Sequence, residues 1–100
     1  MSNQIAVLVK RDYHGAELVE TKRTVYCSFR SIGMREFYQA NASDFHPELK
    51  LVLADYLDYE NEKLVDYEGQ RYRVVRTYRP GQELEIVLQK APAEDGEPDG

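Results

Sequence analysis

Two turn signals divide the stretch from Glu62 to Lys90 into three segments, and this division limits the possible folds more than any other feature of the chain. Glu68-Gly69 and Pro80-Gly81 are dipeptides typical of tight turns. The segments between them are rich in Val, Tyr, Ile and Leu, in the alternating or clustered patterns of strands. The stretch is therefore predicted to form three consecutive antiparallel strands.

Side chains alternate along a strand, so each predicted strand has two faces. In the last strand an apolar row, Leu84, Ile86 and Leu88, opposes Glu83, Glu85 and Gln89. In the middle strand, strict alternation places Tyr72, Val74, Arg76 and Tyr78 on one face and Arg71, Arg73, Val75, Thr77 and Arg79 on the other. Because a small meander is marginal in water, the rest of the chain must cover its apolar face.

The first thirty residues predict two further strands. Ile5 to Lys10 is a short apolar run with Ile5, Val7 and Val9 on one side, and residues 11–15 have the Asp and Gly of a hairpin loop. Residues 18–29 predict a long strand with an exposed first half. Its inner face is predicted to carry Val25, Cys27 and Phe29.

The period changes at Ser31, which can cap a short helix. Met34, Phe37, Tyr38 and Ala42 follow the spacing of three and four residues that an amphipathic helix requires. His46-Pro47 ends it, because proline restricts the preceding residue. Residues 48–55 then predict a strand with Leu49, Leu51 and Leu53 on its inner face, and residues 55–62 predict the connection to the meander.

The predicted fold is mainly β, a small, partly open antiparallel β-barrel of about six strands with one short α-helix. Residues 1–90 form a single domain, since 100 residues suffice for one core without a metal or disulfide. Residues 91–100 contain no large apolar side chain and several acidic ones, which predicts a disordered acidic tail. Cys27 is the only cysteine and excludes an internal disulfide.

Charge and hydropathy narrow the classes of function. A net charge of −5 and a pI near 5.0 argue against a protein whose main function is tight nucleic-acid binding through many phosphate contacts. The first ten residues lack the features of a signal peptide, and no apolar run is long enough to span a bilayer, so a soluble protein with no membrane contact is expected.

Several residue groups have a possible chemical role, which is weighed against an ordinary structural one. The acidic residues near the connection lack a calcium-loop spacing and a nucleophile or histidine partner, so surface charge is the preferred interpretation. His14, His46 and Cys27 have no partner at a catalytic or metal-like spacing. No cofactor, metal site or catalytic set is predicted. The acidic residues are Asp55, Asp58, Glu60, Glu62, Asp66 and Glu68.

Arginines interleaved with tyrosines suggest a second possibility, a module of the OB type that binds single-stranded nucleic acid. Arg71, Arg73, Arg76 and Arg79 would track phosphates while Tyr72 and Tyr78 stack bases. Glu83 and Glu85 on the next strand can instead pair with these arginines. Pairing between strands or between subunits is therefore preferred, and nucleic-acid binding stays an alternative.

Two segments carry a resemblance to a known family. Residues 31–40, SIGMREFYQA, and residues 65–74, VDYEGQRYRV, flank a leucine-rich strand. Together with the first two strands, covering residues 5–90, they resemble the head-tail joining proteins of tailed bacteriophages, also called head completion, head closure or stopper proteins. The resemblance implies a small β-barrel subunit without enzyme activity. Such subunits assemble into a ring below the portal and its adaptor, retain packaged DNA in the head and give the tail a docking surface.

The same resemblance implies partners and sites. The partners would be other copies of the chain, the portal or adaptor protein and a tail completion protein, with DNA passing through the channel without sequence-specific binding. The chain would reside in the host cytoplasm before assembly and in the virion, at the head-tail interface, afterwards. A loop that closes the channel would comprise Asn41, Ala42, Ser43, Asp44, Phe45, His46, Pro47 and Glu48. Contacts between subunits are expected at Arg71, Arg73, Arg79, Arg35 and Tyr38.

Overall fold

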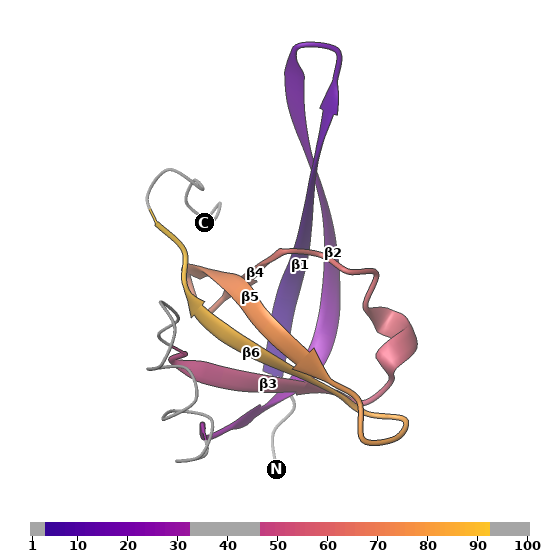
Figure 1. Cartoon of the computed structure of the whole chain (residues 1–100), viewed down its shortest axis with the longest axis vertical. Coiled ribbons are helices and arrows are strands. Elements are labelled where there is room, and N and C mark those ends of the chain that lie inside the picture. Colours follow the sequence, from indigo (N-terminus) through magenta and orange to yellow (C-terminus); the bar gives the residue numbers. More distant parts are fainter. Residues whose placement is uncertain (1–3, 33–46, 93–100) are drawn as a thin grey trace.

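The computed structural model describes residues 4–32 and 47–92, and within these residues six strands form a closed antiparallel barrel (Figure 1). The order around the barrel is β1-β2-β3-β6-β5-β4, and β4 pairs with β1 to close it. This confirms the predicted fold class, with a sheet that closes completely. The elements are β1 (Gln4–His14), β2 (Glu17–Arg30), β3 (Leu49–Leu53), the 3-10 turn η1 (Tyr56–Asp58), β4 (Leu64–Tyr67), β5 (Gln70–Tyr78) and β6 (Leu84–Lys90).

Tight turns fix the pairing of neighbouring strands. Glu68 and Gly69 both have positive φ, 50° and 77°, as a two-residue type I′ hairpin turn requires. Gly15, with φ 68°, opens the turn between β1 and β2. This turn lies farther along the chain than predicted, because β1 continues through Arg11 to His14 instead of ending in a loop.

The core lies inside the barrel and is built largely from the predicted rows. The leucines of β3 and the Leu84-Ile86-Leu88 row of β6 are buried, as predicted, and so are Val25 and Cys27 of β2. Burial raises the pKa of the Cys27 thiol, which favours its protonated, unreactive form. A row of this kind stabilises the barrel by about 25 cal/mol for each Å² of apolar surface removed from water.

The structure defines the inner face of β1 and corrects that of β2. Ile5 is 54% exposed, whereas Ala6 and Leu8 lie in the core, so the inner face of β1 is formed by the even-numbered residues. Phe29 continues the inner row of β2 in sequence but is 52% exposed.

A β-bulge in β5 interrupts the alternation of its side chains. Val74 pairs with Leu88, but the next pair is Arg76 with Val87, so Val75 is an extra residue. Arg76 and Tyr78 consequently pair with the outward residues Val87 and Glu85 and lie on the outer face with Arg73. The predicted separation of Arg76 from the other arginines of β5 is therefore wrong.

Two segments predicted from the sequence fall mostly outside the residues that the structure describes. The short α-helix expected from Ser31 falls mainly on residues 33–46, and most of the acidic tail falls on residues 93–100. In the part of the chain that the structure covers, η1 is the one helical turn, and no helix there is long and apolar enough to cross a membrane.

Candidate functional site

The most conspicuous surface feature is a two-stranded arm that extends beyond the barrel (Figure 1). We define the arm as residues 10–21, which comprise the far ends of β1 and β2 and the turn between them. β4 pairs with β1 only at Val7–Val9, and β3 pairs with β2 only at Ser28–Arg30. Over five residue pairs, about 17 Å of strand, the outer edges of the arm have no partner strand among the described residues.

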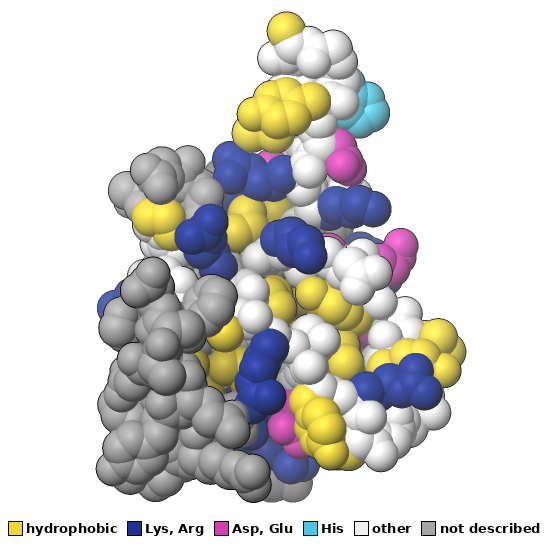
Figure 2. Space-filling view, viewed as in Figure 1, with side chains coloured by type: hydrophobic (Ala, Val, Ile, Leu, Met, Phe, Trp, Pro, Cys, Tyr) yellow, Lys and Arg dark blue, Asp and Glu magenta, His cyan; other side chains and the backbone are white. Residues whose placement is uncertain are grey.

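The outer part of the arm carries apolar side chains in contact with water. Tyr13 is 75% exposed and Leu18 is 40% exposed, and the two are directly opposite each other in the ladder. Figure 2 shows hydrophobic side chains near the tip of the arm. An isolated two-stranded ribbon is marginal in water, and free strand edges readily pair with another chain. The arm therefore has the features of a contact element.

A buried ionic cluster fixes the root of the arm. Arg71 of β5 is 2% exposed, and its guanidinium bridges two carboxylates. Nε donates to Asp66 Oδ1 at 2.8 Å and Nη1 donates to Glu20 Oε2 at 2.8 Å. Arg11 Nε lies 3.2 Å from the same Glu20 oxygen. The hydrogen bonds to Asp66, and then those to Glu20, raise the pKa of Arg71 above its ordinary value. The guanidinium therefore stays protonated, and its charged hydrogen bonds join β5 and β4 to the arm.

A second group of ion pairs and hydrogen bonds, centred on Arg23, holds the connection between β3 and β4 against β2. Arg23 donates from Nη2 to Glu62 Oε2 at 2.8 Å and to the carbonyl of Asp58 at 2.6 Å, and its Nη1 lies 2.9 Å from Glu60 Oε2. Tyr59 donates its hydroxyl to the Glu62 carbonyl at 2.6 Å. Burial, followed by the charge of Glu62, raises the pKa of Tyr59 to about 12. The connection is thus an ordered part of the structure.

Glu62 makes stability depend on acid pH. Burial alone would raise the pKa of its carboxyl, but hydrogen bonds from Arg23 and from the Glu60 backbone outweigh burial and lower it. A lowered pKa in the folded state stabilises the fold above the ordinary value of 4.5, and this contribution is lost as pH falls from that value through the folded pKa. Urea unfolding of Glu62→Gln at pH 7 is expected to show a loss of about 1–2 kcal/mol. Between pH 5 and pH 3 its stability should also fall less steeply than that of the unchanged protein, and identical slopes would contradict this role.

The predicted contacts between subunits occupy different environments. The Arg71 side chain is inside the cluster with partners from its own chain and is not a surface group. Arg73 is exposed on the outer face of β5. Arg79 is also exposed, and its guanidinium carbon lies 3.8 Å from the centroid of the Tyr56 ring. Arg35 and Tyr38 lie outside the described residues.

The predicted channel loop is described only at its end. Residues 41–46 lie outside the described residues, whereas Pro47 and Glu48 are included. The Glu48 backbone N–H donates to the Leu88 carbonyl at 2.8 Å, and its Oε2 accepts from the Lys90 N–H at 3.0 Å. The end of the loop is therefore fastened to β6.

The acidic residues around the connection act mainly through hydrogen bonds and ion pairs with neighbours. Asp55 Oδ1 accepts from the Leu57 N–H at 2.9 Å, capping η1, and from Gln82 Nε2 at 2.7 Å. Among the described residues, no group of three or more His, Cys, Asp or Glu side chains could hold a metal ion. His14 is exposed in the arm, and His46 lies outside the described residues.

The two tyrosines of the alternative nucleic-acid platform do not share a face. Tyr72 pairs with the inward residue Val65 and packs against the core, whereas Tyr78 is 56% exposed on the outer face beyond the bulge. With Arg71 buried as well, the exposed members of the platform are Arg73, Arg76, Tyr78 and Arg79.

Comparison with known proteins adds no assignment. The chain matches no model of a known protein family, and no curated protein shows a significant match to it. The arm and the cluster at its root are therefore interpreted from their own geometry.

Sequence reasoning missed the arm, although one signal could have indicated it. The first hairpin was predicted to have a loop at residues 11–15, which hid the continuous pairing of β1 through His14 with β2 from Glu17. With that pairing, both strands are much longer than β3 or β4, which have 5 and 4 residues. Strands of such unequal length in one barrel must extend past their neighbours.

Proposed function

We propose that this chain is a structural subunit of tailed-phage particles that forms a ring below the portal or adaptor, retains DNA in the head and provides the docking surface for the tail. The observation that carries the proposal is the arm, a ribbon that exposes Tyr13 and Leu18 and whose outer edges have no partner strand among the described residues. Exposed strand edges and apolar side chains are a liability in water, and an assembling subunit can cover them by pairing the ribbon with a neighbour. The resemblance of residues 31–40 and 65–74 to head-tail joining proteins supports the same role.

The ionic cluster at the root suits this role. Buried charges are costly, and replacing them with apolar residues is often neutral or stabilising, so their presence needs a reason beyond stability. We infer that Arg71, Glu20 and Asp66 set the direction of the arm, because together they join the arm to β4 and β5. A pre-oriented arm would bind its neighbour with less loss of conformational entropy.

Ring formation would use one heterologous contact, repeated around an axis. The arm of one subunit would lie against the barrel of the next, with Arg73 and Arg79 as further exposed contact residues. Residues 41–48 would project toward the channel. DNA would pass without tight binding, and neighbouring portal, adaptor and tail completion proteins would contact the two faces of the ring.

The nucleic-acid alternative has weaker support, because Tyr72 packs inward and leaves no continuous row of exposed aromatic side chains. A catalytic role built on the acidic residues has weaker support still, since Glu60 and Glu62 are engaged by Arg23 and Asp66 by Arg71.

The experiment is complementation of a phage in which this reading frame is disrupted. Electron microscopy is expected to show free tails beside heads that have lost their DNA, and a plasmid copy should restore joined particles. A copy with Tyr13→Ser and Leu18→Ser should not, because truncation of two central contacts costs a few kcal/mol, roughly 100-fold in affinity. We expect a comparable fall in infectious titre.

Leu57→Ser is the matched control, since Leu57 is 66% exposed but lies in η1, away from the arm. It should restore joined particles fully. Intact, DNA-filled, tailed particles in the absence of the protein would overturn the proposed function. Full rescue by the arm variant would instead overturn the role of the arm.

A further inference from the structure

A second exposed apolar pair lies at the other end of the β1–β2 ribbon from the arm. Ile5 is 54% exposed and Tyr26 is 70% exposed, and the two are directly opposite each other in the ladder. We call this pair the foot of the ribbon, and the pair of Tyr13 and Leu18 its tip. Among the described residues, no other two exposed large apolar side chains face each other across a ladder. The ribbon thus exposes one aromatic and one aliphatic side chain at each end.

The foot borders a small hollow between β2 and β3. The β2–β3 ladder ends at Ser28 opposite Val52, so the two strands separate from there towards Tyr26 and Ala54. The hollow at this point has a volume of about 90 Å³ and is lined by Tyr26, Cys27, Ser28, Val52, Ala54 and Glu83. The foot therefore offers an apolar surface beside a recess that is open to a side chain of another molecule.

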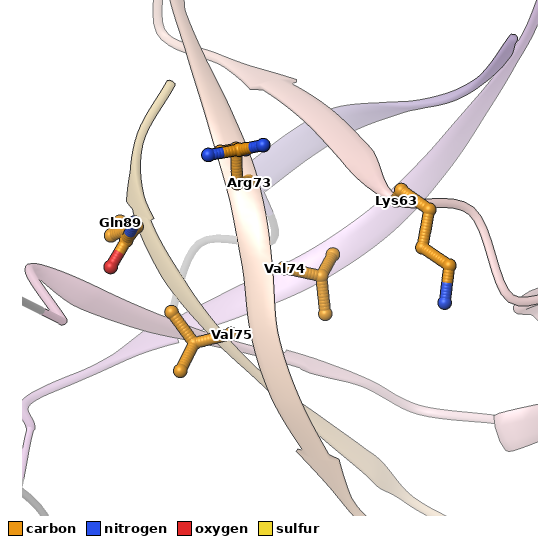
Figure 3. A pocket seen from close by; sticks show the side chains of 5 residues that line it. All are labelled: Lys63, Arg73, Val74, Val75 and Gln89. Atoms are coloured by element: carbon orange, nitrogen blue, oxygen red, sulfur yellow. The ribbon is translucent and has the colours of Figure 1, made fainter. Parts of the chain in front are cut away.

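A larger hollow over β5 suits an apolar tip less well. It has a volume of about 340 Å³ and is lined by Lys63, Arg73, Val74, Val75 and Gln89. Figure 3 shows Val74 on the Lys63 side of β5 and Val75 on the Gln89 side. Apolar side chains placed here would remove charged and amide groups from water, which is unfavourable. The foot is the better match for the tip.

The tip and the foot of one chain cannot meet. Ile5 and Tyr13 are eight residues apart on one continuous strand, a distance of about 26 Å. The same separation holds for Leu18 and Tyr26 on β2. A tip can therefore reach a foot only on another molecule. Because tip and foot are different surfaces, each such contact leaves one of each uncovered, and it can be repeated until a ring closes.

The area of this contact indicates its strength. A fully covered Tyr side chain buries roughly 150–250 Å². At their observed exposures, the two tyrosines together with Leu18 and Ile5 would bury on the order of 400–500 Å². Stable complexes of two proteins bury about 1,200–2,000 Å². A single contact should therefore be weak, whereas every subunit of a closed ring would make two.

We propose that the tip of the arm binds the foot on a second copy of this chain. The proposal names the surface of the neighbouring barrel that receives the arm, and it rests on the proposed function as far as the ring is concerned. The contact itself is a property of the chain, and it is measured on the isolated protein.

The first test uses two variants, each of which removes one surface. The tip variant carries Tyr13→Ser and Leu18→Ser, and the foot variant carries Ile5→Ser and Tyr26→Ser. The tip variant is labelled with ¹⁵N, and unlabelled foot variant is added to millimolar concentration, where a weak contact is populated. Amide shifts are expected at residues 5 and 26–28 of the labelled chain, because its intact foot meets the intact tip of the other variant.

Unlabelled tip variant is the first control, and it should cause no such shifts. The matched control carries Leu57→Ser and Tyr78→Ser, which remove two exposed apolar side chains outside the ribbon. Since its tip is intact, it should cause the same shifts as the foot variant. Absence of shifts with both proteins, or shifts confined to other parts of the barrel, would overturn the proposed docking surface.

The second test places the foot variant in the phage complementation experiment. It is expected to fail to restore joined particles, as the arm variant does. Full rescue by the foot variant alone would mean that the arm binds elsewhere, which overturns this inference and leaves the proposed function in place. Intact particles without the protein, together with the expected NMR shifts, would overturn the proposed function and support the contact.

Discussion

Replacing Leu88 with alanine is expected to lower the free energy of unfolding by about 3–4 kcal/mol. Leu88 is fully buried, and it pairs with Leu49 on one side and Val74 on the other, so the cavity would open between two neighbouring strands. For a domain of this size the loss corresponds to a fall in Tm of roughly 15 °C or more. Calorimetry or urea unfolding measures both quantities.

Leu57→Ala is the control, because it removes the same atoms from a side chain that is 66% exposed. Its effect should stay within about 0.5 kcal/mol. Similar losses for the two variants would mean that the barrel interior does not provide the main apolar stabilisation.

Replacing Arg71 with alanine is expected to cost about 3 kcal/mol, because the change removes the guanidinium that Asp66 and Glu20 share and leaves Arg11 as the cation beside Glu20. The value lies at the low end for buried pairs, since the Glu20 side chain is 26% exposed and can regain water. Unfolding in urea measures this loss, and Arg73→Ala, on an exposed residue of the same strand, should cost less than about 0.5 kcal/mol.

The same variant should also loosen the arm more than the barrel. Hydrogen exchange of the amides in residues 17–21 is expected to accelerate beyond what the global loss explains, because Arg71 joins Glu20 of the arm to Asp66 of β4. A double-mutant cycle with Asp66→Ala should give a coupling energy of at least about 1 kcal/mol. Additive effects and an arm that stays protected would remove the anchoring role from Arg71.

Local sequence signals predicted the strands well. The turn at Glu68-Gly69 and the apolar row of β6 depend on residues next to one another in the chain, and both are present as predicted. The bulge at Val75 was not predictable in this way, because an extra residue is set by pairing with β6 and leaves no mark on the alternation itself. The structure also decides which face of β1 points inward. Ile5 is the larger apolar residue, yet the small Ala6 is the one that points inward.

The candidate site was less predictable than the fold. The sequence indicated that the arginines of β5 make contacts. Which of them is buried depends on Glu20, 51 positions away in the chain. Arg73 remains on the surface, as a contact residue requires, whereas Arg71 turned out to join parts of its own chain. Arg71 and Arg73 occupy equivalent places in the alternation of the strand. Their burial differs because only the folded barrel brings Glu20 and Asp66 to Arg71.

The barrel is closed by two short ladders, β1–β4 and β2–β3, and these are the places where it is expected to open. The β1–β2 ribbon joins the four-stranded β3-β6-β5-β4 sheet through two seams, each of three residue pairs. Both seams are shorter than the other ladders, and the β1–β4 seam unites residues farther apart in sequence than any other pairing of the barrel, so the two seams should open before the other ladders. Breaking them would release the ribbon as one unit and leave the sheet paired. Local opening of the barrel is thus expected at these two seams. Arg71 and Arg23 make ion pairs that connect the ribbon with the rest of the barrel and oppose this opening.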